Sequence, residues 1–440
     1  MRDGGHDLDL AQAHLRDGTA GMVDALSRLI AVDTSFPPGL GYGELADVAE
    51  ALFAPLGFSF ERIEVPETLW QAPGSGAKGS RVNLIARRRT GLPACSIYFH
   101  TDVVPAGDDW TRPAFELTHD GNRLFGRGTA DMKGTIASVY GALAAADKAG
   151  VPLGYDPVLL FCTDEEGGLY PGIRYLAETG AVEGHLLSFN GQASPRIWGG
   201  CFGSLDLAIE IVGRSAHSGE PSGGINAIEV ALPLLDRLMD LKREVEMRVS
   251  AMVPPPFYPA GNKLSAKLTI AAINAGAKGS SLPGTCRIVI NRRYTPEEDG
   301  ASVESELRDA IDAALKDSGA LDWTVQVIGH LAPVDDPSGP HWLRWQAALA
   351  EGFGYKDDDF VRYGSSTSSD MGWVQQAGIR EILLGGLARP DSRIHAADEF
   401  TTTDDLQSLA HSVLAYLAAP FRPDLQPEFE TNQNSKGEQR

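Results

Sequence analysis

The stretch Phe161-Cys162-Thr163-Asp164-Glu165-Glu166-Gly167-Gly168 marks the carboxyl end of a central strand. It closes an apolar run, residues 157–162, that is too short for a buried helix and rich enough in Val, Leu and Phe for a buried strand. Three carboxylates therefore stand where a strand leaves its sheet, and two glycines after them allow a tight turn. In an open α/β sheet, ligands bind in the crevice beyond the carboxyl ends of the strands. Acidic residues gathered in such a crevice favour a bound cation.

The same acidic run has a second interpretation, as the start of a helix. Thr163 would then be the cap, and the acids would lie near the positive end of the helix dipole. Asp131, in the glycine-rich segment 126–134, has the same two interpretations. That segment begins like a nucleotide-binding glycine loop, but Asp131 replaces the third glycine and no buried strand runs directly into it. Taken alone, these two stretches leave capping and cation binding open.

Helical and strand-like segments alternate over most of the chain. Helices are expected near residues 15–30, 42–56 and 135–148, and strands near 59–65, 81–86, 95–99, 157–162 and 185–189, with a further apolar segment at 381–384. This alternation predicts an α/β fold, with a mostly parallel central sheet flanked by helices.

Several of these strands and loops are followed by side chains that bind metals. His100 and Asp102 follow the strand 95–99 and point to the same side of an extended chain, where the carboxylate can orient the imidazole. The candidate ligands from strand ends and loops are His100, Asp131, Glu165, Glu166 and His395. Mixed imidazole and carboxylate donors suit zinc, cobalt or manganese and not calcium. The whole set favours metal binding over capping.

The pattern changes between residues 202 and 331. Strand, helix, strand, strand, helix and strand follow one another there, which is the order of a ferredoxin-like α+β unit. We expect an inserted domain at 202–331, with the first domain formed by 1–201 and 332–421. The polar segment 422–440 is expected to be disordered.

Length and composition set further limits. A chain of 440 residues is too long for one ordinary core, and its formal net charge of −21 disfavours nucleic acid and anionic membranes as partners. No stretch approaches the roughly 20 apolar residues of a membrane span, and the start lacks the features of a secretory signal, so we expect a cytoplasmic protein. The scattered cysteines are expected to be buried thiols: Cys95, Cys162, Cys201 and Cys286.

Several motifs, in order, resemble the metal-dependent amidohydrolases that include acetylornithine deacetylase, succinyl-diaminopimelate desuccinylase, aminoacylase and carboxypeptidase G. The motifs are residues 100–105, 126–134, 163–168, 213–219 and 395–399. The resemblance covers about residues 20–420. It implies a catalytic α/β domain with an inserted lid and dimerisation domain, and a homodimer formed through that inserted domain. It also implies Zn²⁺ as the cofactor, one or two ions per subunit, with Co²⁺ or Mn²⁺ as possible substitutes.

The resemblance implies a role for each matched metal-site residue. His100 is similar to a ligand of the first metal, and Asp131 to the carboxylate that bridges both metals. Glu166 and His395 are similar to ligands of the second metal, while Glu165 matches the general base.

Four further residues match positions around that site. Asp102 is similar to the carboxylate that partners the ligand histidine. His217 and Asn226 match positions in the inserted domain that contact substrate in relatives, and the histidine often reaches the site of the neighbouring subunit. Arg293 is similar to the arginine of that domain that binds the substrate carboxylate.

The chain departs from the family pattern at Asn190. Relatives place Asp or Glu after the strand that here covers 185–189, as the remaining ligand of the first metal. An amide oxygen is a neutral and weaker donor, so the site containing His100 should hold its metal less tightly than the other. Gln192 is an alternative donor at this strand end.

These observations predict hydrolysis of an amide bond in an N-acyl amino acid, by metal-activated water with Glu165 as the general base. A dipeptidase or carboxypeptidase of the same family is an alternative that the sequence does not separate. A non-catalytic metal-binding homologue is the alternative from another class, raised by Asn190. No G-x-S-x-G motif occurs, which disfavours a serine hydrolase.

Overall fold

The computed structural model describes residues 4–71 and 76–419. A six-stranded sheet lies at its centre, in the order β1-β2-β6-β3-β7-β17. The strands are β1 (Ser59–Val65), β2 (Arg81–Arg87), β6 (Asp156–Cys162), β3 (Ala94–His100), β7 (His185–Ser188) and β17 (Ile382–Leu384). β6, β3, β7 and β17 run parallel, while β2 is antiparallel to both β1 and β6. The predicted α/β fold with a mostly parallel central sheet is confirmed.

The sequence of β6 explains why it lies in the middle of this sheet. All seven of its residues are buried, as expected for a strand whose two faces are both covered. In β3 only Ala94 is not fully buried. Phe99 and Phe161, on the two neighbouring strands, stack with their ring centroids 5.2 Å apart.

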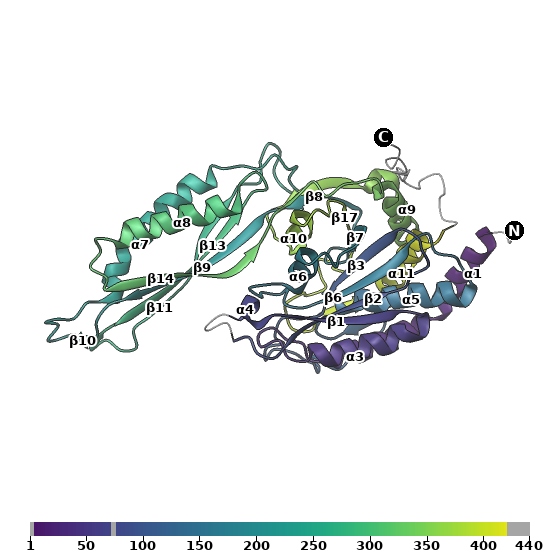
Figure 1. Ribbon diagram of the computed structural model, residues 1–440, viewed down its shortest axis with the longest axis horizontal. Helices are drawn as coiled ribbons and strands as arrows, with labels where there is room; N and C mark the ends of the chain where they lie inside the picture. The colour runs from purple at the N-terminus through teal and green to yellow at the C-terminus, as the bar shows by residue number, and fades with distance from the viewer. Residues whose placement is uncertain (1–3, 72–75, 420–440) are drawn as a thin grey trace, which may run out of the picture.

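Helices cover the sheet (Figure 1). They are α1 (Gly4–Asp17), α2 (Thr19–Ile30), α3 (Tyr42–Phe53), α4 (Glu67–Trp70), α5 (Lys133–Ala149), α6 (Gly172–Glu178), α9 (Trp342–Phe353), α10 (Met371–Gln376) and α11 (Thr403–Leu417), with 3-10 turns η1 (Ala54–Leu56) and η2 (Asp357–Asp359). α3 contacts β2, α5 contacts β3, and α6 contacts β2 and β6. The helical segment expected near residues 15–30 is confirmed, with α2 covering most of it and the end of α1 the rest, and the two helices meet at Gly18.

A second sheet extends away from the central one (Figure 1). Its strands are β9 (Gly203–Val212), β11 (Lys267–Ala275), β13 (Thr285–Tyr294) and β14 (Asp322–Leu331), in the antiparallel order β11-β13-β9-β14. Two helices pack together beside it, α7 (Ala227–Glu246) and α8 (Gly300–Leu315). Its buried apolar residues, including Leu207, Leu238 and Ile311, form a hydrophobic core of their own.

Three small sheets complete the architecture. They are β15-β8-β16, β18-β5-β4 and β10-β12, formed by β15 (Val334–Asp335), β8 (Arg196–Cys201), β16 (Val361–Ser365), β18 (Phe400–Thr402), β5 (Arg123–Phe125), β4 (Thr118–Asp120), β10 (Ala216–His217) and β12 (Ser281–Leu282). β8 and β16 pair in parallel. β8 belongs to the segment that leaves the central sheet, and β16 belongs to the segment that returns from the second sheet. The strand pair β10-β12 lies at the end of the second sheet remote from the central one (Figure 1).

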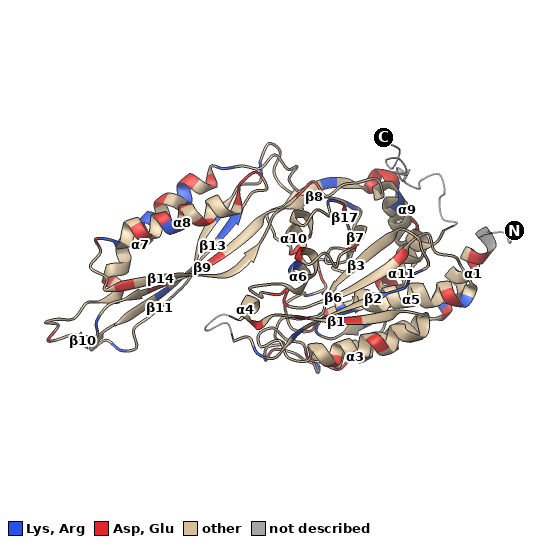
Figure 2. Cartoon of the chain, viewed as in Figure 1, with Lys and Arg blue, Asp and Glu red and all other residues tan. Residues whose placement is uncertain are grey.

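Other expectations have mixed outcomes. The four cysteines are buried free thiols, as predicted. Residues 422–440, expected to be disordered, lie outside the described residues. Within the described ranges no helix has the length and apolar character needed to cross a membrane. Figure 2 shows acidic residues on α3, α7, α8 and β1.

His185, at the start of β7, makes stability depend on pH. Its ring accepts or donates a hydrogen bond at 2.6 Å from the Tyr416 hydroxyl and stacks on His341 with centroids 3.7 Å apart. Burial, together with the nearby His341 and Arg344, lowers the pKa of His185 well below its usual value. Below about pH 6.5, His185 therefore binds a proton in the unfolded chain but stays neutral in the folded chain.

We expect the free energy of unfolding to decrease as the pH falls below about 6.5. His185 alone should contribute up to about 1.4 kcal/mol per pH unit. The substitution His185→Gln should flatten that dependence, as measured by melting temperatures between pH 8 and pH 5. An equally steep loss in the variant would show that His185 is not the group responsible.

Candidate active site

The acidic turn and His100 meet at one edge of the central sheet. β3 and β6 are parallel, and His100 pairs in register with Cys162, so both strands end at the same level. His100 is fully buried, and Glu166 lies in the turn that follows β6. The pairing therefore places the imidazole of one strand beside the carboxylates of the other.

Asp131 lies between the two histidines. His100 Nε2 is 3.0 Å from Asp131 Oδ1, and His395 Nε2 is 3.3 Å from Asp131 Oδ2. His395 Nε2 is also 3.0 Å from Glu166 Oε2. The structure thus brings together four of the predicted ligands, although nearly three hundred positions separate the two histidines in the chain.

The capping interpretation does not describe these acids. α5 begins at Lys133 after Met132 and has no side-chain cap, and the carboxylate of Asp131 contacts the two histidines instead. Glu166 lies in a turn, and the next helix begins only at Gly172.

The donor set fits a metal ion. Ligand atoms of His100, Asp131 and Glu166 all lie within 4.8 Å of one another, so these side chains are close enough to surround bound metal. Hydrogen bonds to Asp131 and Glu166 raise the pKa of His395 to about 10, which shows that this cluster attracts positive charge. Nitrogen and oxygen donors in this combination are typical of zinc sites, and also suit cobalt and manganese.

Glu165 points to a different neighbour. Its Oε1 accepts a hydrogen bond of 2.9 Å from Asn190 Nδ2, so the amide orients this carboxylate. Burial raises the pKa of Glu165 well above its usual value, and nearby Asp370, Glu166 and Asp131 act in the same direction. Glu165 is therefore a buried carboxylate with a high affinity for a proton.

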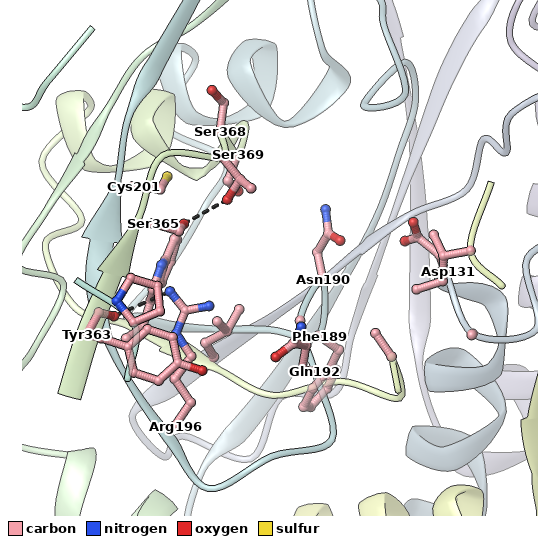
Figure 3. Close-up of a pocket in the computed structure, with 18 of the residues that line it drawn as sticks. Asp131, Phe189, Asn190, Gln192, Arg196, Cys201, Tyr363, Ser365, Ser368 and Ser369 are labelled. Carbon is pink, nitrogen blue, oxygen red and sulfur yellow. Dashed lines mark hydrogen bonds between the residues drawn. The ribbon is translucent and has the colours of Figure 1, made fainter. Parts of the chain in front are cut away.

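A pocket of about 320 Å³ opens beside this cluster. Asp131, Asn190 and Gln192 line it on the metal side, and Arg196, Tyr363 and four hydroxyl residues line it elsewhere: Ser365, Thr367, Ser368 and Ser369. Figure 3 shows Arg196 and Tyr363 on the side opposite Asp131, with Asn190 between them. Its volume suits a small molecule rather than a polymer.

Residues 96–419 match the model of peptidase family M20/M25/M40. The chain belongs to this family. That match confirms the resemblance drawn from the motifs and the class of enzyme, a metal-dependent hydrolase acting on amide bonds.

Individual relatives are similar to this chain over different fractions of its length. Acetylornithine deacetylase of Klebsiella pneumoniae is 30% identical over 253 residues, 57% of this chain and 61% of the relative, so the chain matches less than two thirds of that enzyme's length. Succinyl-diaminopimelate desuccinylase of Maricaulis maris is 28% identical over 389 residues, 86% of this chain and 90% of the relative. The solved structure of the di-peptidase Dug1p from Saccharomyces cerevisiae has a TM-score of 0.76 at 19% identity and covers 93% of this chain and 98% of its own. This last likeness shows the shared fold.

Asp102 lies beside both His100 and the acidic turn. His100 Nδ1 lies 3.1 Å from the main-chain oxygen of Asp102 and 3.8 Å from its carboxylate, so the backbone carbonyl is the nearer partner of the ring. Asp102 Oδ2 accepts a 2.8 Å hydrogen bond from the backbone N–H of Glu166. The Asp102 side chain therefore also holds the acidic turn through Oδ2, while Oδ1 faces the imidazole at 3.8 Å, and the predicted orientation of His100 by this carboxylate stays a prediction.

The predicted substrate residues of the second sheet are spread apart. Arg293, near the end of β13, donates a hydrogen bond to Ser368, which lines the pocket. His217 is exposed on β10, and Asn226 caps α7 by accepting from Ile228 N–H at 3.0 Å. Neither His217 nor Asn226 lines the pocket of its own chain.

Glu399 ends one of the quoted motifs, and no role was predicted for it. Its carboxylate is buried and accepts from Arg127 Nη1 at 2.7 Å. It also accepts from the backbone N–H groups of Gly128 at 3.2 Å, Ala130 at 3.0 Å and Asp131 at 3.1 Å. One acid thus fixes the loop that presents Asp131. The only sequence signal for this role of Glu399 was a charged residue at the end of the His395 motif, which accompanies a distant glycine-rich loop.

The substitution Glu399→Gln should lower metal affinity roughly 10- to 100-fold, because supporting contacts of this kind orient a ligand. An amide cannot accept all four bonds or neutralise Arg127. Zinc affinity measured against a competing chelator tests this. Glu183→Gln is the matched control, since Glu183 pairs with Arg87 and Arg89 away from the site and should change affinity less than twofold. Equal affinities for Glu399→Gln and the parent protein would contradict the assignment.

Proposed function

We propose that this protein hydrolyses the amide bond of an N-acyl amino acid, with a bound metal and Glu165 as general base. The observation that carries the proposal is the convergence of His100, Asp131, Glu166 and His395 beside a pocket that also receives Asn190, the partner of Glu165. Substrate classes named for the relatives, acetylated and succinylated amino acids, fit a pocket of this size.

Zn²⁺ is the proposed cofactor, one or two ions per subunit. Asp131, Glu166 and His395 would hold one ion, and His100 with Asp131 the other. When bound, the metal would lower the pKa of a water molecule and polarise the amide carbonyl. Asn190 lies at the position of an acidic ligand in relatives, and its amide group is engaged with Glu165, so we propose weaker binding at the His100 site.

Glu165 is proposed to take the proton of the attacking water and to pass it to the leaving amine. Burial suits this role because it raises the proton affinity of the carboxylate. Asn190 keeps Oε1 in place, and the neighbouring Glu166 remains free to hold metal. The two adjacent acids would thus have different roles, Glu165 as the base and Glu166 as a metal ligand.

The second sheet and its helices are proposed to act as a lid and as the contact between two subunits. Arg293 would bind the substrate carboxylate, because it already reaches Ser368 in the pocket. His217 and Asn226 would serve the pocket of the neighbouring subunit, since they do not line the one in their own chain. The limits 1–201, 202–331 and 332–421 for the domains are part of this proposal.

A cytoplasmic location is part of the proposal. The four buried thiols are of the kind that a reducing compartment maintains.

The test is metal analysis combined with an assay of the zinc-loaded protein on a panel of N-acetyl and N-succinyl amino acids and dipeptides. We expect bound zinc and turnover of N-acyl amino acids. Faster turnover of dipeptides than of every acylated amino acid would favour the dipeptidase alternative. Tight zinc binding without turnover of any panel member would contradict the proposal and favour a non-catalytic homologue.

A further inference from the structure

Arg196 lines the pocket and has no carboxylate partner among residues 4–71 and 76–419. It begins β8, where Arg196 pairs with Val361 of the parallel strand β16, so its backbone is fixed by the sheet. Within the described part of the chain, its side chain donates a hydrogen bond to a single acceptor, the main-chain oxygen of Tyr363 at 3.3 Å from Nη2. Its Nε is buried and has no hydrogen-bond partner among the described residues.

Three fully buried arginines of this chain each pair with a carboxylate, unlike the partly buried Arg196. Arg81 pairs with Asp164 at 2.7 Å, Arg127 with Glu399 at 2.7 Å and Arg292 with Glu298 at 2.5 Å. A guanidinium carries five N–H donors and is costly to bury without a counter-charge. Among the described residues, Arg196 is thus a cation without a paired carboxylate, although the chain carries a net charge of −21.

The place of Arg196 in the pocket indicates what that anion is. Its guanidinium carbon lies 4.3 Å from the ring centroid of Tyr363, and this contact holds the guanidinium against the wall of the pocket. Asp131 and Asn190 lie across the pocket (Figure 3). Arg293 donates a hydrogen bond to Ser368, which also lines this pocket. A small substrate whose amide lies near Asp131 therefore meets two separate cationic side chains.

We propose that Arg196 binds a second carboxylate of the substrate, so that the enzyme selects N-acyl amino acids carrying two carboxylates. The inference rests on the proposed function and narrows it: Arg293 takes the carboxylate of the amino acid, and Arg196 takes another. A planar guanidinium with several unused donors matches a carboxylate better than it matches a neutral amide. The second carboxylate belongs either to a dicarboxylic acyl group or to an acidic side chain.

The experiment compares acids with uncharged amides of the same size. One arm pairs N-succinyl-L-alanine with N-succinamoyl-L-alanine, and the other pairs N-acetyl-L-glutamate with N-acetyl-L-glutamine. In one arm we expect the zinc-loaded protein to prefer the acid in kcat/KM by roughly 10- to 100-fold, the range for a hydrogen bond to a charged group. The arm that shows the preference identifies the source of the carboxylate.

The substitution Arg196→Met should reduce that acid-to-amide ratio by the same factor, mainly through KM, because Arg196 lies away from the reacting atoms. Arg196→Lys should restore part of the ratio, since an ammonium keeps the charge and loses the planar fork. Arg62→Met is the control: Arg62 is partly exposed, pairs with Asp47 and Glu50, and should leave the ratio unchanged. Melting temperatures show whether each variant is folded.

The inference fails if the parent protein treats acid and amide alike within about twofold in both arms, or if the preference survives in Arg196→Met. Should Arg196→Met not fold, Arg196→Lys and the parent ratio still decide. Turnover without an acid preference would overturn the role of Arg196 alone. Lack of turnover across this set and the wider panel would overturn the proposed function and this inference together.

Discussion

Replacing Glu165 by Gln lowers kcat by about 10²- to 10⁴-fold in our account, the contribution typical of a general base. The amide keeps the size of the side chain and loses the ability to accept a proton. Because Glu165 is hydrogen-bonded to Asn190, while the two histidines pair with Asp131 and Glu166, zinc content should stay near that of the parent protein. Steady-state kinetics and metal analysis on the same sample measure both effects.

Glu166→Gln is the matched control for this prediction. Glu166 Oε2 lies 3.0 Å from His395 Nε2 and belongs to the proposed metal site, so its amide variant should lose metal as well as activity. The two neighbouring variants therefore separate the base from the ligand. Loss of zinc from Glu165→Gln with zinc retained in Glu166→Gln would mean that the roles are exchanged.

Replacing Arg81 by Met should lower the free energy of unfolding by about 3–5 kcal/mol, the cost of leaving a buried ion pair without one partner. Arg81 is fully buried, its Nε lies 2.7 Å from Asp164 Oδ2, and its guanidinium stacks over Trp70 at 3.9 Å. Asp164 also accepts a 2.6 Å hydrogen bond from the Tyr42 hydroxyl. This pair ties the acidic turn to α3 and β2, so its loss should also reduce activity. Denaturant unfolding measures the change.

A double substitution isolates the buried charge. Arg81→Met with Asp164→Asn should recover part of the lost stability, because the neutral amide no longer needs a cation. Arg88→Met is the control, since Arg88 and Asp147 form a partly exposed ion pair at 2.7 Å that should contribute no more than about 1 kcal/mol. A small effect of Arg81→Met, comparable to that of Arg88→Met, would contradict the structural role of the pair.

The fold was predictable where the sequence pattern is local. Continuous apolar runs such as residues 157–162 identify buried strands, and their ends identify the sheet edge at which ligands bind. That reasoning located Glu165, Glu166 and His100. The break at Gly18 was missed because apolar spacing continues on both sides of it, and the short strands were missed because two or three residues carry no periodicity.

Contacts between distant segments were beyond the reach of pattern alone. Glu399 holds the loop of Asp131, and the Tyr98 hydroxyl donates to Asp370 at 2.5 Å across 272 positions. Each of these residues looks like an ordinary polar or aromatic residue in the sequence. A second contact of Asp102 was also hidden in the sequence: its Oδ2 accepts a hydrogen bond from the backbone N–H of Glu166. Family motifs, and not spacing, joined His395 to the site.

Anomalous diffraction at the zinc absorption edge, from crystals of the zinc-loaded protein, tests the central claim most directly. We predict a peak within coordination distance of Asp131, Glu166 and His395, and a weaker second peak beside His100. Zinc bound elsewhere, with these four side chains free of it, would contradict the account.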